Sequence, residues 1–446
     1  DLLTAPPPDL PSVVARGRRK QMTKKLASGV AAAALIVGAV MLIQAQPFEP
    51  PLVSQPTSTT TVSSQSAVNG WVAFAANNSA GDNDIYVARV GESPRRIMGF
   101  DSDGLEQVCP AFSPDGARLA YGQAQGRSEV GYSGGLLVVA SLDREGNAST
   151  SLELDVGATS APPCPLWSPD GERIAITVHS GDRVSPPQGS DVEGDVWIVN
   201  LDSGKTTVLS GLYVWDDGWG FPDMEWSPDG AELAIANGQV TIYSAVTGES
   251  RAMDGATGAE ALTWSEDGTR IAFQRFGLGP HSSSSPWRGG ELRIAEVDGT
   301  GGYLLADGFM AFHGIGPVWS PLGDRIVYQR VCSTYASSFS PTQPCREEHD
   351  VVLVTLDGTE TVLPHLRLPG SDATEPMWPY RVTWSPDGEQ LLYQVWGSAD
   401  SDFTEALIAV PLDPSSPPIV LYEGDGGYVD DGWFAFQSWG RQPGAP

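Results

Sequence analysis

The chain has 446 residues, which allows about two or three domains, and its 51 Gly and 36 Pro argue against a bundle of long helices. It carries 26 Lys and Arg against 55 Asp and Glu, a formal net charge of −29. This acidity argues against nucleic-acid binding, because phosphates would be repelled rather than neutralised. After residue 68 the excess is larger, 20 basic against 52 acidic residues or −32, but a hydrophobic content of 41% still provides for a buried core.

The amino-terminal residues predict a membrane anchor. Residues 1–25 form a basic stub, 26–45 contain an uncharged run of 18 residues, and 46–68 form a spacer rich in Pro, Ser and Thr. An apolar run of this length can span a bilayer as a helix, and cations confined to the stub favour a cytoplasmic amino terminus. We therefore expect a single-pass cell-membrane protein whose remaining residues are extracytoplasmic.

Two alternatives to this topology stay open. The first is a cleaved signal peptide, although Ile43-Gln44-Ala45 is a poor cleavage site. The second follows from the first residue, which is Asp1 rather than Met. A cytoplasmic signalling domain could precede it, with the exported part as its sensor.

One motif recurs six times after residue 68: an aromatic residue, then Ser-Pro-Asp-Gly or a close variant, then alternating apolar residues. The copies occupy residues 109–122, 164–177, 223–236, 261–274, 316–329 and 381–394, with anchor aromatics Phe112, Trp167, Trp226, Trp264, Trp319 and Trp384. Successive anchors are 38 to 65 residues apart. A repeat at this period indicates a solenoid or a propeller.

The motif is typical of a β-hairpin. Pro presets φ at the second turn position, Asp suits the third, and Gly adopts the left-handed conformation that ends the turn. Glu266 replaces the Pro and Leu322 the Asp in two copies, which we expect to weaken those turns. Two more strand-like runs follow each hairpin, and four antiparallel strands make one propeller blade.

The two ends of the repeat region complement each other. Residues near 71–75 begin a unit that lacks its first strand, and residues 434–439 supply a lone first strand with Trp439. If these strands pair, the ring closes on a composite blade and no sheet edge stays open there. We predict an all-β, seven-bladed β-propeller over residues 69–446, with six or eight blades as the nearest alternatives.

The repeat resembles that of the TolB-type propeller family, relatives of the WD-repeat proteins, over residues 70–441. This resemblance implies a propeller fold and a binding scaffold, since family members are mostly binding proteins. It also admits an enzyme, because related propellers precede the catalytic domain of prolyl-oligopeptidase-type enzymes. The basic stub before the anchor is similar to those of many actinobacterial membrane proteins.

Chain direction assigns the loops to two faces. The Ser-Pro-Asp-Gly turns share one face, here called the turn face, so the connections between second and third strands and between blades lie on the other, the insertion face. The long insertions on that face are 122–135, 178–194, 276–290 and 331–349, and the interblade segments 212–226 and 427–439 join them. Functional residues concentrate on such loops.

The two interblade segments both contain the pattern Tyr-Val, Asp-Asp-Gly, Trp. We predict a partner-binding site for a protein, peptide or glycan from Trp215, Asp216, Asp217, Trp219, Asp430, Asp431 and Trp433. The alternative is that these tryptophans pack between blades and the aspartates are solvated turn acids.

The four cysteines are compatible with two disulfides in an exported protein. Cys332 and Cys345 flank one insertion, while Cys109 and Cys164 stand three residues before the anchor aromatics of successive blades. A zinc site from Cys332, Cys345 and His349 is the alternative, although its spacing matches no standard pattern.

Enzymatic motifs are weak. Gly131-Tyr132-Ser133-Gly134-Gly135 matches G-x-S-x-G, but a nucleophile elbow needs a strand before and a helix after it. The acids in 81–84 and 101–104 do not reproduce a calcium loop and are interpreted as turn acids. We predict no catalytic residue, cofactor or metal site, and a membrane-tethered binding or sensing module. A hydrolase or lyase that uses Ser133 or carboxylates in the central channel is the alternative.

Overall fold

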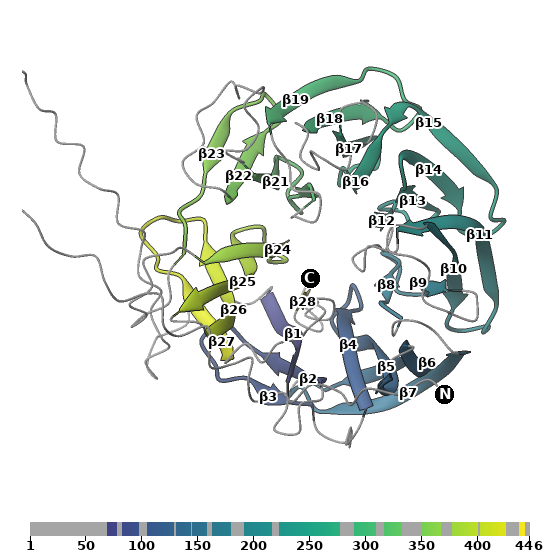
Figure 1. The fold of residues 1–446 in the computed structure, drawn as a ribbon, viewed down its shortest axis with the longest axis vertical. Helices are drawn as coiled ribbons and strands as arrows, with labels where there is room; N and C mark the ends of the chain where they lie inside the picture. Colours follow the sequence, from purple (N-terminus) through teal and green to yellow (C-terminus); the bar gives the residue numbers. More distant parts are fainter. Residues whose placement is uncertain are drawn as a thin grey trace, which may run out of the picture. The chain divides into compact units, whose positions relative to one another are not determined.

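The computed structural model describes residues 69–77, 83–97, 105–128, 131–143, 145–157, 163–179, 191–215, 223–276, 290–308, 316–331, 349–366, 377–399, 402–424 and 437–441. The chain divides into residues 1–49 and 50–446, and every described residue lies in the second unit. The described residues form β-strands and turns and contain no helix. Their strands make seven four-stranded antiparallel sheets arranged around a centre (Figure 1).

The first three blades follow one another along the chain, each from its innermost to its outermost strand. Blade 1 consists of β4 (Leu105–Phe112), β5 (Arg118–Ser128), β6 (Gly131–Leu142) and β7 (Ala148–Gly157). Blade 2 consists of β8 (Leu166–Trp167), β9 (Arg173–His179), β10 (Asp191–Asn200) and β11 (Thr206–Trp215). Blade 3 consists of β12 (Asp223–Trp226), β13 (Glu232–Ala236), β14 (Gln239–Ser244) and β15 (Ser250–Thr257).

The next three blades repeat this order. Blade 4 consists of β16 (Ala259–Trp264), β17 (Arg270–Phe276), β18 (Gly290–Glu296) and β19 (Tyr303–Gly308). Blade 5 consists of β20 (Val318–Trp319), β21 (Arg325–Val331), β22 (His349–Thr355) and β23 (Glu360–Val362). Blade 6 consists of β24 (Trp378–Trp384), β25 (Gln390–Ala399), β26 (Asp402–Pro411) and β27 (Ile419–Gly424).

The seventh sheet, here called the closing blade, joins the two ends of the repeat region and confirms the predicted closure. Its order is β28 (Gln437–Arg441), β1 (Asn69–Asn77), β2 (Asn83–Ala88) and β3 (Arg95–Arg96). β28 pairs antiparallel with β1, so that Val72 lies opposite Trp439. The Asn69 side chain also donates to Asp387 of a blade 6 turn, at 2.8 Å. The ring therefore has seven blades, as predicted.

Each Ser-Pro-Asp-Gly turn is held by its own side chains. In blade 1 the Gly116 N–H donates to the Ser113 carbonyl at 2.8 Å, the Asp115 carboxylate accepts from the Ala117 N–H at 3.0 Å, and φ of Gly116 is +68°. The predicted weakening at Leu322 is offset, because the Ser320 hydroxyl donates to Asp324 instead. The turn at Glu266 keeps the serine–aspartate pair with Asp267.

The anchor tryptophans connect blades. The indole N–H of Trp167 donates to the Ala111 carbonyl of the preceding blade at 2.9 Å, and Trp226, Trp264 and Trp384 donate to equivalent carbonyls at 3.1 to 3.2 Å. Among the described residues, seven apolar clusters fill the spaces between neighbouring sheets. At these four anchors a buried indole ring is combined with a paired N–H, whereas the N–H of the buried Trp319 has no partner among the described residues.

The insertion face differs from the sequence expectation. The sequence predicts a loop over residues 122–135, but β5 continues to Ser128 and β6 begins at Gly131. In the interblade segment 212–226, the first four residues belong to β11. Past the residue that pairs with the anchor aromatic, Leu119 in β5 and Leu233 in β13, β5 continues about six residues further than β13 does. At 3.3 Å per residue this is roughly 20 Å. The hairpins of blades 1 and 6 therefore project from the insertion face, whereas that of blade 3 ends at Asn237 and Gly238.

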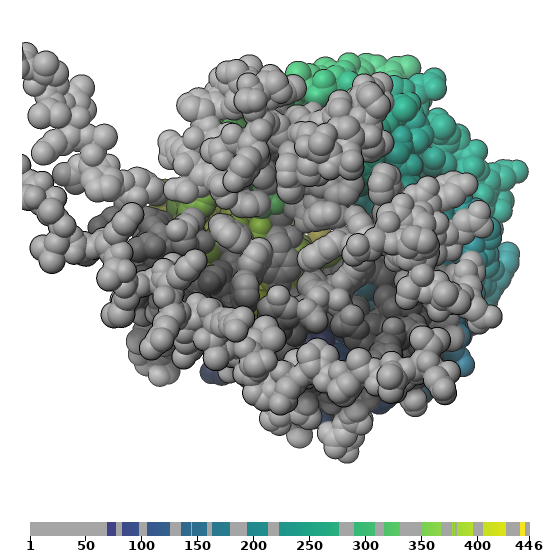
Figure 2. Space-filling model, in the orientation of Figure 1, coloured from purple at the N-terminus to yellow at the C-terminus, as the bar shows by residue number. Residues whose placement is uncertain are grey.

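The outermost strands form the rim of the ring. β11, β15 and β19 are the outermost strands of blades 2, 3 and 4, and the teal atoms of this part of the chain form the right-hand edge of the molecule in Figure 2. Val208 on β11 and Leu304 on β19 are 47% and 46% exposed. Leu304 is next to Tyr303, which is 39% exposed, and a few exposed apolar residues are ordinary on soluble surfaces. We assign no site to the rim.

Candidate functional site

Two acids lie at the insertion-face end of β12, the innermost strand of blade 3. Asp223 and Glu225 lie three and one residues before the anchor Trp226. Both side chains reach blade 4, where their carboxylates accept from the backbone N–H groups of Leu262 and Trp264, each at 2.7 Å. They satisfy donors on the inner edge strand of blade 4, which has no further strand beside it.

The environment of these acids shifts their titration. Burial raises the pKa of Asp223 to about 6, opposed by the Leu262 N–H and the charge of Arg381. Burial likewise raises the pKa of Glu225 to about 8, opposed by the Trp264 N–H and reinforced by Asp223. On β16, burial raises the pKa of Glu260 to about 7. Half-buried carboxyls that change charge near neutral pH can exchange protons or bind a cation.

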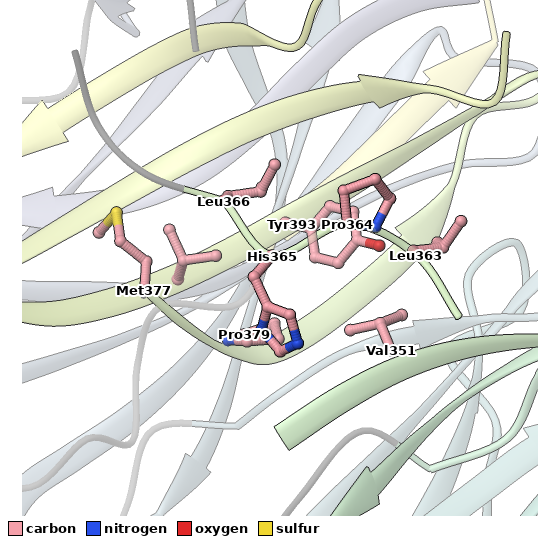
Figure 3. A pocket seen from close by; sticks show the side chains of 9 residues that line it. Val351, Leu363, Pro364, His365, Leu366, Met377, Pro379 and Tyr393 are labelled. Atoms are coloured by element: carbon pink, nitrogen blue, oxygen red, sulfur yellow. The ribbon is translucent and has the colours of Figure 1, made fainter. Parts of the chain in front are cut away.

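A small pocket lies between blades 5 and 6, also at the insertion-face end (Figure 3). Its lining is mainly apolar and comprises Val351, Leu363, Pro364, His365, Leu366, Met377, Pro379, Tyr393 and Val395. The cavity is about 10 Å³, room for one water molecule. A sugar or a peptide side chain does not fit into it as it stands.

A buried polar cluster supports one wall of this pocket. Arg330 on β21 is 2% exposed and pairs with Glu360 of β23, while its guanidinium also donates to the Tyr328 hydroxyl at 2.9 Å. Asp350 of β22 is fully buried, and its Oδ1 lies 3.0 Å from His365 Nε2. These contacts join the three outer strands of blade 5 and fix the segment that carries His365.

The predicted partner-binding residues are only partly visible. Trp215 is the last residue of β11, with its backbone opposite Asp191, so it belongs to a strand rather than to a loop. Asp216, Asp217, Trp219, Asp430, Asp431 and Trp433 lie outside the described residues. The partner-binding site therefore stays a prediction.

The structure tests the reactive residues unevenly. Ser133 lies within strand β6 opposite Gln125, and β6 continues to Leu142, so the strand–turn–helix context of a nucleophile elbow is absent at that position. Asp84, interpreted as a turn acid, is instead a fully buried residue of β2 paired with Arg96 at 3.1 Å. Among the described residues, no group of three or more potential ligands could hold a metal ion.

One predicted disulfide is confirmed. Cys109 and Cys164 are bonded, with Cα atoms 5.1 Å apart, and the bond joins β4 of blade 1 to the segment just before β8 of blade 2. Cys109 adopts φ of +55° where β4 shifts register between Val108 and Ala111. Cys332 and Cys345 lie outside the described residues, so their disulfide and the zinc alternative stay untested.

The membrane prediction also falls mainly outside the visible part. Residues 1–68, which include the stub, the anchor 26–45 and the spacer, are not described. Within the described ranges, no helix is long and apolar enough to cross a bilayer.

The sequence reasoning missed Asp223 and Glu225, although a signal was present. Of the six repeat copies, only the third has acids both three residues and one residue before the anchor, where other copies have pairs such as Ala261 and Thr263. The pocket residues His365 and Tyr393 gave no comparable signal. They are 28 positions apart and belong to different blades.

The fold and these sites define the chain as a seven-bladed β-propeller. No protein-family profile matches the sequence, and no match was found among curated proteins. Solved structures that are similar include an oligogalacturonate lyase in complex with manganese, with 14% identity, 78% of this chain and 87% of that one covered, and a TM-score of 0.49.

Two further similar structures are a putative 6-phosphogluconolactonase from Bacteroides uniformis and a putative TolB from Agrobacterium tumefaciens. The first has 13% identity, coverage of 84% and 99%, and a TM-score of 0.46. The second has 17% identity, coverage of 65% and 94%, and a TM-score of 0.37. Because these scores are all below 0.5, the class assignment rests on the strand order of this chain.

Proposed function

We propose that the protein is a membrane-tethered extracytoplasmic propeller that captures a protein, peptide or glycan on its insertion face. The observation that carries this proposal is the difference between the two faces. The turn face repeats one Ser-Pro-Asp-Gly geometry, whereas the insertion face has projecting hairpins on blades 1 and 6, the acids of β12 and the pocket beside β24. Binding surfaces of rigid scaffolds are built from such varied connections.

Two observations support an extracytoplasmic location. The uncharged run in residues 26–45 follows six cationic side chains, and no basic residue follows it before the propeller. The Cys109–Cys164 disulfide favours an oxidising compartment, because thiols are kept reduced in most cytosols.

Protease access tests this topology. In intact cells that express the full chain, an added protease is expected to digest residues 69–446 and to leave the basic stub protected, because the stub would be cytoplasmic. Cells opened with detergent serve as the control for digestion of both parts. Protection of the propeller in intact cells would refute the orientation.

Ligand capture tests the binding face. The full chain in detergent is applied to peptide and glycan arrays, and each signal is titrated to obtain its dissociation constant. We expect that changing Asp216, Asp217, Asp430 and Asp431 to Asn weakens the specific signal at least tenfold, because charged side chains at a binding surface contribute about 1.4 kcal/mol or more when paired.

The matched control removes the same amount of charge from the turn face. It changes the exposed residues Glu145, Glu172, Glu296 and Glu389 to Gln. An equal loss in both variants would show that net charge alone drives the signal.

The alternative of catalysis is examined in parallel with esterase, peptidase and glycosidase substrates. Turnover that disappears in Ser133→Ala would overturn the proposal.

A further inference from the structure

The pocket between blades 5 and 6 contains two polar groups among apolar walls. His365 follows β23 of blade 5 and Tyr393 belongs to β25 of blade 6, so the two groups come from neighbouring sheets (Figure 3). Tyr393 is 3% exposed, and its hydroxyl has no hydrogen-bond partner among the described residues. A buried hydroxyl is normally paired, so a partner is expected within this pocket.

His365 offers a matching group. Its Nε2 lies 3.0 Å from Oδ1 of Asp350, and the Asp350 side chain is fully buried. Because a carboxylate accepts but does not donate, the tautomer with its proton on Nε2 matches this contact, and that tautomer leaves Nδ1 as an acceptor. Among the described residues, Asp350 is the only hydrogen-bond partner of the His365 ring, and the side chain is 15% exposed.

The size of the cavity decides which molecule can connect the two groups. At about 10 Å³ it takes one water and excludes larger ligands. The other seven side chains that line the pocket are apolar, so they make no hydrogen bond with a bound water.

We propose that one ordered water molecule binds in this pocket, donates to His365 Nδ1 and accepts from the Tyr393 hydroxyl. The resulting chain Tyr393–water–His365–Asp350 connects blades 5 and 6 at the insertion face. The inference does not depend on the proposed binding function.

A double-mutant cycle on the full chain tests the water. Tyr393→Phe removes the hydroxyl, and His365→Gln keeps a donor at the position of Nε2 but removes Nδ1. Each change alone is expected to lower the equilibrium constant for folding about fivefold or more. The double variant is expected to be no worse than the more damaging single variant, because either change already breaks the bridge.

Two further measurements complete the test. Tyr121→Phe, a buried tyrosine of blade 1, is the control and should combine with His365→Gln multiplicatively. A high-resolution crystal structure of the full chain should show one water within hydrogen-bond distance of Tyr393 and His365. The proposal would be overturned if the double variant's folding equilibrium constant fell by the product of the two single effects, to within about twofold. A crystal structure without that water in the pocket would also overturn it.

Discussion

Gly116→Ala is expected to open the ring. Gly116 lies in the first Ser-Pro-Asp-Gly turn with φ of +68°, and a Cβ there would overlap the backbone carbonyl of Arg441 in β28. Arg441 pairs with Asn69, so relief of this clash displaces the strand that closes the propeller. We expect a loss of about 3 kcal/mol or more in the free energy of unfolding, from left-handed strain together with the steric overlap.

Gly91→Ala is the matched control. Gly91 has a comparable φ of +87° in a turn of the closing blade, but a Cβ there meets no atom within 4 Å. Its cost should be that of strain alone, about 1–2 kcal/mol. Urea unfolding followed by tryptophan fluorescence measures both variants. Equal costs would show that the contact between Gly116 and β28 does not contribute to closure.

The repeat predicted most of the fold because its residues have local physical roles. The Gly in each turn must adopt positive φ, and the anchor tryptophan buries a large apolar ring between neighbouring blades. The closing pair was predictable from complementary ends, since neither the 71–75 segment nor Trp439 could complete a blade alone. Equivalent positions in successive repeats likewise predicted the Cys109–Cys164 disulfide.

The candidate sites were less predictable because they depend on distances between repeats. That Asp223 and Glu225 reach the backbone of blade 4 follows from the side of β12 on which they lie, not from their residue types. The Asp350–His365 pair crosses between β22 and the segment after β23. The length of β5 was missed because Gly-rich residues 122–135 have low strand propensity, and pairing with β6 overrides that preference.

Glu225→Gln is expected to remove a pH-dependent loss of stability. The pKa of Glu225 is about 8 in the folded chain against 4.5 for a free glutamate, chiefly because of burial. The folded state therefore holds a proton that the unfolded state releases, and stability falls as pH rises from about 4.5 to 8. The upper bound of this loss is about 4–5 kcal/mol at 1.36 kcal/mol per pKa unit. Asp223 acts in the same direction up to about pH 6.

The amide oxygen of Gln can still accept from the Trp264 N–H, so the variant removes the charge and keeps the link between blades 3 and 4. Unfolding free energies of wild type and variant should converge near pH 5 and separate towards pH 8, with the variant more stable. Glu172→Gln, at an exposed position of the turn face, is the control and should follow wild type at every pH. A variant that is equally destabilised at both pH values would mean that Glu225 is ionised in the fold and that its charge strengthens the contact with blade 4.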